Sequence, residues 1–200
     1  KLELILTVVS AIAVVGLLAP GLSVWGDYIK VPKGAVKVEV LGYQWGWNYR
    51  LAGEDGVLGT TSIHNISDEN PYGLDLNDPN GKDDLMVQDA DLHLQIDIPV
   101  EFLLRAIDVL HNFYVPEFRA KMDMVPGLVT YYWIIPTKTG EYEILCAELC
   151  GTGHYAMFGT VIVEEESDYT NWLAQQITFE SALAQNKIKN KTIQLAENTK

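Results

Sequence analysis

The sequence predicts a mainly β domain, a Greek-key β-sandwich or barrel, preceded by an N-terminal helix long enough to cross a membrane. Residues 4–26 carry no charged side chain, which is typical of a membrane span. Between residues 36 and 163, short apolar runs alternate with clusters of glycine, proline, asparagine and aspartate, the pattern of strands and turns. Because no long helical pattern separates these runs, the strands are expected to pack against one another.

The first element, residues 1–28, is predicted to be a transmembrane helix. Twenty-odd helical residues rise roughly 30–36 Å, about the thickness of the hydrocarbon core of a bilayer. Pro20 lies near the far end, where a kink is tolerated, and Trp25 and Tyr28 are suited to the membrane interface. A signal peptide and a buried core helix are the alternatives, but a signal peptide would lack such a charge-free length and would show a small-residue cleavage site.

Strand signals follow this helix. Val36, Val38 and Val40 alternate with their neighbours at the period of two that marks a strand. Segment 42–49, GYQWGWNY, holds more aromatic residues than the core face of a strand needs, so some are expected at the surface. Further strands are predicted at residues 92–98, 102–107, 128–135, 141–145 and 159–163.

Residues 52–91 form an irregular, acidic segment with many turn signals. Residues 52–110 hold 13 acidic and two basic side chains, a local charge of −11 out of −13 for the whole chain. A solvated loop is the simple interpretation, and an acidic surface that attracts a basic partner is the sharper one. His64 and His93 lie outside any ligand-like motif, so we interpret them as ordinary loop or strand histidines.

The C-terminal region, residues 167–200, is predicted to be a helix followed by a polar tail. Trp172, Phe179 and Leu183 recur at helical spacing on one face of a helix over 168–183. We assign no function to the lysine-rich tail. The sequence contains no C-x-x-C-H motif, so no covalently attached haem is expected.

The strongest chemical signal is the segment from Cys146 to Met157, with the pattern C-x3-C-x3-H-x2-M. Thiolate, imidazole and thioether form a soft ligand set that suits copper better than calcium or magnesium. Two thiolates this close can each bridge two ions, so a dinuclear copper centre fits, with His111 as the best candidate for a second histidine. A disulfide, a zinc site and buried unreactive cysteines are the alternatives; the thioether argues against zinc, and burial alone would not explain the nearby histidine and methionine.

Residues 146–157, CAELCGTGHYAM, closely resemble the CuA loop of subunit II of haem–copper cytochrome c oxidases. Residues 108–111, DVLH, together with 123–127, DMVPG, resemble the part of that family that brings its other histidine, and residues 42–49 resemble its aromatic box. These motifs occur in the family's order, which makes the resemblance specific. It implies a cupredoxin-like CuA domain over residues 29–166, outside the cytoplasm, with residues 1–28 as the second helix of a membrane hairpin.

The resemblance implies a complete ligand set for two copper ions. Cys146 and Cys150 would supply two bridging thiolates, and His111 and His154 would each bind one of the ions. Met157 would supply a weak thioether ligand, and Glu148 a backbone carbonyl. Each of these positions carries the family's residue.

The resemblance implies three further roles. Trp45 would accept electrons from cytochrome c, the alternative being a core tryptophan. The Glu148 carboxylate would bind a magnesium ion shared with subunit I, or would accept hydrogen bonds from loop amides. Glu3 would stand at the mouth of a proton-uptake channel on the inner side, the alternative being an interfacial carboxylate that faces water.

The function implied by the resemblance is electron transfer into a terminal oxidase. Cytochrome c, or a fused or docked haem domain, would donate single electrons to the CuA centre, which would pass them to haem in subunit I for proton-pumping reduction of oxygen to water. The expected partners are subunit I, other oxidase subunits and membrane lipid, with no nucleic acid. A quinol-oxidase subunit that keeps only the fold is one alternative, disfavoured by the intact ligand set. A copper carrier is the other, disfavoured by the membrane helix and the aromatic box.

Overall fold

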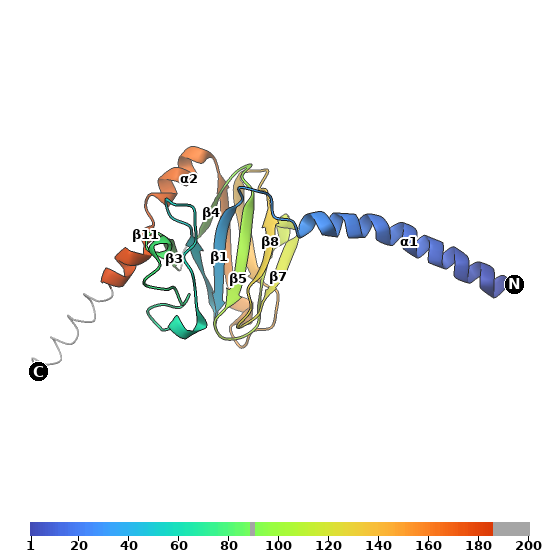
Figure 1. The fold of residues 1–200 in the computed structure, drawn as a ribbon, viewed down its shortest axis with the longest axis horizontal. Helices are drawn as coiled ribbons and strands as arrows, with labels where there is room; N and C mark the ends of the chain where they lie inside the picture. Colours follow the sequence, from blue (N-terminus) through green and yellow to red (C-terminus); the bar gives the residue numbers. More distant parts are fainter. Residues whose placement is uncertain (89–90, 186–200) are drawn as a thin grey trace, which may run out of the picture. The chain divides into compact units, whose positions relative to one another are not determined.

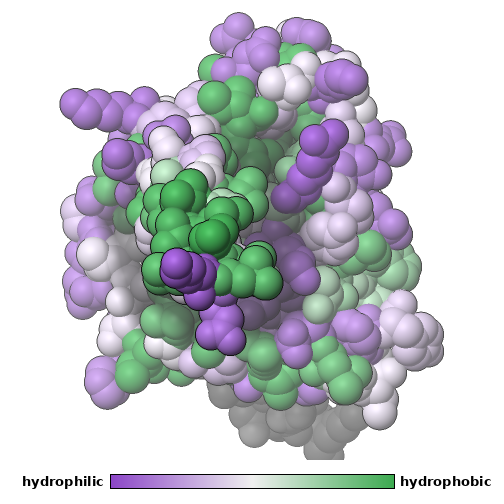
Figure 2. All heavy atoms as spheres, turned by 90° about the vertical axis from the view of Figure 1, so that its right-hand side faces the viewer, coloured by the Kyte–Doolittle hydropathy of each residue, from purple (hydrophilic) through white to green (hydrophobic). Residues whose placement is uncertain are grey.

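The computed structural model describes residues 1–88 and 91–185, and the chain divides into two compact units, Lys1–Lys33 and Gly34–Lys200. The first unit contains the helix α1, Leu2–Tyr28 (Figure 1), in which no residue is buried. Figure 2 looks toward the free end of α1 and shows hydrophobic side chains around it, with polar atoms at its tip. The mean hydropathy of its most apolar stretch is 2.5, so its length and composition suit a membrane span.

The second unit is built on two β-sheets (Figure 1), with strand orders β11-β3-β2-β1-β5-β8 and β4-β10-β9-β6-β7. The strands are β1 (Val36–Tyr43), β2 (Gly46–Leu51), β3 (Leu85–Gln88), β4 (Leu92–Gln95), β5 (Val100–Ala106), β6 (His111–Val115), β7 (Ala120–Met124), β8 (Thr130–Ile134), β9 (Gly140–Cys146), β10 (Phe158–Glu164) and β11 (Ile177–Thr178). Between them lie the 3-10 helices η1 (Ile63–Asn65), η2 (Pro79–Gly81), η3 (Pro116–Phe118) and η4 (His154–Ala156) and the helix α2 (Glu166–Leu173). The predicted mainly β, cupredoxin-like sandwich is confirmed.

The core lies between the two sheets. Strand β5 alternates buried and half-buried residues along its whole length, as the period-two pattern predicts. The ring of Phe102 in β5 lies 5.5 Å from that of Phe113 in β6, and Trp47 in β2 lies 5.4 Å from Phe113. Each fully buried side chain of this size contributes on the order of 1.5–3 kcal/mol. The aromatic contacts therefore join the two sheets face to face.

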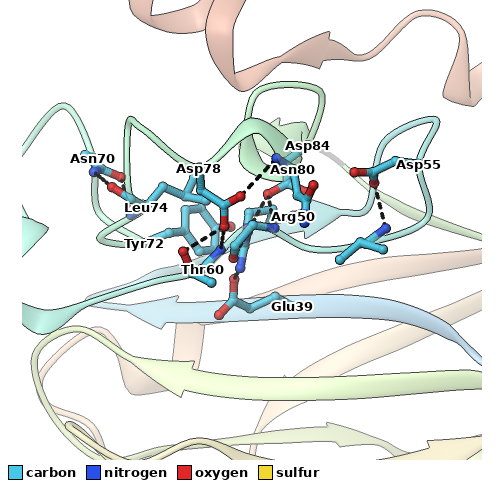
Figure 3. A network of polar contacts seen from close by, with 12 residues as sticks. Glu39, Arg50, Asp55, Thr60, Asn70, Tyr72, Leu74, Asp78, Asn80 and Asp84 are labelled. Atoms are coloured by element: carbon cyan, nitrogen blue, oxygen red, sulfur yellow. Dashed lines mark hydrogen bonds and ion pairs between the residues drawn. The ribbon is translucent and has the colours of Figure 1, made fainter.

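A buried ionic network attaches the segment between β2 and β3, residues 52–84, to the six-stranded sheet (Figure 3). Arg50 is 2% exposed, and its guanidinium lies 2.5 Å from the carboxylates of both Glu39 and Asp84. Arg105 donates to Glu39 at 2.9 Å and to the Tyr72 carbonyl at 3.0 Å. Burial raises the pKa of Asp84 above its ordinary value, although Arg50 and the Gly59 amide oppose that rise. Two cations and two anions thus neutralise one another inside the protein.

The acidic segment is more ordered than its composition predicts. Tyr72 and Leu74 have no exposed surface, and they pack in a cluster with Leu41, Met86 and Phe179. The range 52–91, predicted to be irregular, also contains strand β3. Burial of Leu74 and Tyr72 explains why this segment folds, because they supply the apolar side chains that a solvated loop lacks.

The C-terminal region differs from the predicted continuous helix over 168–183. Helix α2 ends at Leu173, Ile177 pairs with Met86 in β3, and residues 179–185 are helical again. The break lets Phe179 enter the Tyr72 cluster while Trp172 stacks on the His93 ring, with the ring centroids 4.5 Å apart. The predicted tail over 186–200 lies outside the described residues.

Candidate metal centre

Three strands bring the soft ligands to one end of the five-stranded sheet. Strand β6 begins at His111, β9 ends at Cys146, and β10 begins directly after Met157. Phe113 and Cys146 are register partners in neighbouring strands, which places His111 close to Cys146. The loop between β9 and β10 supplies the remaining ligands. Two residues 35 positions apart therefore meet through the strand register.

The predicted ligand atoms lie close together. The Sγ atoms of Cys146 and Cys150 are 3.6 Å apart, and neither cysteine forms a disulfide. His111 Nδ1 lies 3.9 Å from the sulfur of Cys146, and His154 Nδ1 lies 3.6 Å from the sulfur of Cys150. Met157 Sδ lies 3.7 Å from the sulfur of Cys150. Each thiol therefore has a histidine of its own.

These distances fit metal ions of copper size. Two atoms bound at roughly 2.0–2.3 Å to one tetrahedral ion lie about 3.3–3.8 Å apart, close to the separations of the sulfur and nitrogen atoms. His111 has no exposed surface, and Cys150 and Met157 are 3% and 2% exposed, so water is largely excluded. Burial, followed by the neighbouring Cys146, raises the pKa of Cys150 to about 11. The Cys150 thiol of the metal-free chain therefore keeps its proton at neutral pH, and copper binding would release it.

A backbone carbonyl completes the donor set. The carbonyl oxygen of Glu148 lies 3.1 Å from Cys146 Sγ, and the Glu148 side chain is half-buried. Gly151 has a φ of +120°, which favours glycine, and a side chain at Gly153 would collide with the indole ring of Trp45. The loop therefore needs both glycines to wrap this closely.

His111 is oriented by a carboxylate. Its Nε2 lies 2.8 Å from Asp108 Oδ1, which leaves Nδ1 directed toward Cys146. Burial alone would raise the pKa of Asp108, but hydrogen bonds from His111 and from the amides of Val109 and Gln44 outweigh it and lower that pKa. Asp108 and Gln44 were not predicted as site residues. The sequence signal for Asp108 is its place three residues before His111, whereas Gln44 has none.

The remaining residues discussed from the sequence, Trp45, Glu3, His64 and His93, lie outside the cluster of copper ligands. Trp45 is 42% exposed, and its Nε1 donates to the Cys150 carbonyl at 3.3 Å, so it is both a surface residue and a neighbour of the metal loop. Glu3 is exposed near the start of α1, in the other compact unit. His64 is exposed in η1, and His93 lies in β4 with its Nδ1 2.7 Å from Glu164. Neither of these two histidines belongs to the cluster.

Comparison with known proteins identifies the family. Residues 36–165 match the model of the cytochrome c oxidase subunit II periplasmic domain. The chain is 56% identical over 188 residues to alternative cytochrome c oxidase subunit 2 of Bradyrhizobium diazoefficiens, covering 94% of this chain and 68% of that protein. It is 34% identical over 175 residues to probable cytochrome c oxidase subunit 2 of Rickettsia conorii, covering 88% and 53%.

A solved structure has the same fold. The periplasmic domain of subunit II of cytochrome oxidase of Bradyrhizobium japonicum aligns with a TM-score of 0.53 at 24% identity, covering 72% of this chain and 95% of that domain. The present chain spans about half the length of the Rickettsia relative, at 53%. The family match over residues 36–165 and the 56% identity show that this chain belongs to the cytochrome c oxidase subunit II family.

Proposed function

We propose that this chain is the electron-accepting subunit of a haem–copper oxidase and that its soft-ligand cluster holds a dinuclear copper centre of the CuA type. The observation that carries the proposal is the pair of buried thiols 3.6 Å apart, each with its own histidine nitrogen. Two copper ions held by this ligand set would accept and donate one electron at a time. Cys146 and Cys150 would bridge them, His111 and His154 would bind one each, and Met157 and the Glu148 carbonyl would complete the set.

The protein residues around the cluster would perform three tasks. The sandwich excludes water and fixes the ligands, Asp108 orients His111, and Trp45 offers a flat, half-exposed ring on the surface beside the loop. An electron donor that contacts Trp45 would lie one hydrogen bond away from the Cys150 carbonyl. This arrangement supports Trp45 as the residue that accepts electrons from cytochrome c or a docked haem domain.

A surface groove with acidic residues at its edge would be a further contact site for the electron donor. Leu41, Tyr43, Ile66 and Ile107 line a groove of about 630 Å³, and Asp68 and Glu69 stand at it. Two of the lining residues are chain neighbours of residues beside the metal centre, since Ile107 precedes Asp108 and Tyr43 precedes Gln44. A basic donor would be attracted by the carboxylates and held by the apolar lining, which is how charged encounter surfaces work.

The remaining roles concern the whole oxidase. We propose that residues 1–28 anchor the chain in the membrane, that residues 29–166 lie outside the cytoplasm against subunit I, and that the Glu148 carboxylate binds a magnesium ion shared with subunit I. Carboxylate oxygen suits that hard ion. Glu3, in the membrane anchor, would serve proton uptake. In this complex the chain would deliver electrons, and subunit I would reduce oxygen and pump protons.

The copper proposal is tested by metal analysis and electron paramagnetic resonance of the purified full chain. We expect two coppers per chain and a mixed-valence spectrum, both lost in Cys146→Ser. Glu143→Ser, at an exposed position of the same strand, is the matched control and should keep both. One copper per chain with a single-ion spectrum would contradict the proposal and would favour a copper carrier instead.

A further inference from the structure

Gln44 joins the two halves of the candidate metal centre. It lies in the turn between β1 and β2, and its backbone N–H donates to Asp108 Oδ2 at 2.7 Å. The other oxygen of Asp108 holds His111. The side-chain Nε2 of Gln44 donates to the carbonyl of Cys150 at 2.8 Å. One residue therefore contacts both the turn that leads into the histidine strand β6 and the cysteine loop, which are far apart in sequence.

The Cys150 carbonyl receives a second donor from the next residue. Trp45 Nε1 approaches the same oxygen at 3.3 Å, so the two lone pairs of the carbonyl are both used. The segment that follows begins with Gly151, whose φ of +120° only glycine adopts readily and whose carbonyl accepts from the His154 amide at 3.2 Å. Fixing the Cys150–Gly151 peptide plane also fixes the direction of the Cys150 side chain. That direction sets the distances from its sulfur to Cys146, His154 and Met157.

We propose that Gln44 is a positioning residue for the copper centre and that Gln44 and Trp45 together form a two-donor clamp on the Cys150 carbonyl. This inference rests on the proposed copper site and goes beyond it by assigning a residue that binds no metal. The two donors share one acceptor, so either of them alone holds the peptide. Loss of both leaves a buried carbonyl without a partner and lets the loop move.

The clamp is tested with Gln44→Met, Trp45→Phe and the double variant, each in the full chain loaded with copper. Gln44→Met keeps nearly the size of the side chain and removes its N–H donor, whereas Trp45→Phe removes the N–H donor together with one ring of the indole. Gln176→Met is the matched control. The Gln176 side chain also donates to a backbone carbonyl, that of Trp172 in α2, at 2.9 Å, and this carbonyl is not part of the metal loop. The measurements are the copper paramagnetic resonance spectrum, the rate of copper loss to a chelator, and the melting temperature of the metal-free chain.

We expect each single variant to keep the wild-type spectrum and to lose copper at most about threefold faster. The double variant should have an altered spectrum and lose copper roughly tenfold faster than the product of the two single effects, the excess that shared interactions produce. The control should match the wild type in both measurements.

Two results overturn the assignment while leaving the copper proposal intact. One is a double variant with the wild-type spectrum and a rate equal to the product of the single effects. The other is a double variant whose faster copper loss is matched by an equal loss of stability, seen as a lower melting temperature of its metal-free form. The two residues would then support only the fold. A wild-type chain that binds no copper pair overturns the proposed function, and the clamp with it.

Discussion

Two buried polar clusters within residues 1–88 and 91–185 are built in opposite ways. In the network around Arg50, two cations face two anions, and the guanidinium of Arg50 lies 2.5 Å from each of two carboxylates. In the cluster around Cys150, the sulfur and nitrogen atoms of cysteine, histidine and methionine approach one another to 3.6–3.9 Å, and no arginine or lysine from the described part of the chain takes part. In the first cluster cations and anions neutralise one another, although Asp84 Oδ1 has no hydrogen-bond partner among the described residues, whereas the second gathers electron-pair donors that need a cation. This difference distinguishes a structural cluster from a site for a ligand.

Removal of the Arg50 charge should give the largest effect on stability. In Arg50→Met, Glu39 and Asp84 stay buried without their shared partner, which costs on the order of 3–5 kcal/mol. Chemical denaturation of the metal-free chain measures this loss. Lys121→Met, which removes a charge from an exposed position of β7, is the control and should change stability by less than about 0.5 kcal/mol. A loss below about 1 kcal/mol in Arg50→Met would mean that the network does not hold the segment over 52–84.

The opposite outcome is expected for the metal cluster. Cys150→Ala should abolish the copper spectrum and change the stability of the metal-free chain by only about 1 kcal/mol, because it removes one small buried group and leaves no unpaired charge. Denaturation and metal analysis of the same preparation measure both quantities. Arg50→Met should show the reverse, with copper retained in the folded fraction. A collapse of the metal-free Cys150→Ala chain would show that the thiols also support the fold.

The same difference explains which cluster could be predicted from sequence. Five predicted copper ligands lie within residues 146–157, so their chemistry is visible in one segment, and His111 lies in a motif of its own. The Arg50 network joins residues of β1, β2, β5 and the segment before β3, and nothing local marks Glu39 or Asp84 as buried. Gln44 was missed for the same reason, since its partner Cys150 is 106 positions away. Long-range contacts decide the role of such polar residues.

Composition predicted the fold class well but failed for two segments. The alternating valines of β1 and the apolar runs of β5 and β10 indicated the sandwich correctly. The acidic segment resembled a solvated loop, because its two decisive apolar residues, Tyr72 and Leu74, are surrounded by turn residues. In the C-terminal region, helical spacing suggested one helix, but the pairing of Ile177 with Met86 interrupts it. Tertiary contacts outweighed local propensity in both places.

The third test concerns the exposed charges of the acidic segment and has a moderate effect. Asp68→Asn combined with Glu69→Gln should slow association with a basic c-type cytochrome about two- to fivefold at low salt, because distant charges act mainly on the encounter rate. At about 1 M salt the difference should vanish, since the screening length falls to roughly 3 Å. Rapid-mixing kinetics measure the rate. Glu141→Gln with Glu143→Gln, on exposed positions of β9, is the control. An equal slowing in the control would mean that only total charge matters.

The smallest effect is expected at Asp78, which holds the acidic segment by exposed hydrogen bonds and forms no ion pair within the described residues. Its carboxylate accepts from the Thr60 amide at 2.8 Å, the Thr60 hydroxyl at 2.7 Å and the Asn80 amide at 3.0 Å. The Thr60 amide, its hydroxyl and the Asn80 amide lower the pKa of Asp78 below its ordinary 3.8. The folded state therefore favours the ionised form. The stability from these bonds is present above the unfolded pKa and is lost as the pH falls through the lower folded pKa.

Hydrogen exchange of the full chain tests this expectation. As the pH falls below 3.8, the protection factor of the Thr60 amide should fall in the wild type, because Asp78 then gains its proton in the folded state. In Asp78→Asn this amide should already be less protected at pH 5 and should show no further step. Asp75→Asn, which alters a neighbouring carboxylate that accepts from Asn77, is the control and should behave as the wild type does. The amides around Arg50 should stay protected as the pH falls, because burial raises the pKa of Asp84 and the folded state therefore loses no stability when that carboxylate takes up its proton. Loss of protection at Thr60 and at Arg50 together would mean that acid opens the whole segment rather than one exposed contact.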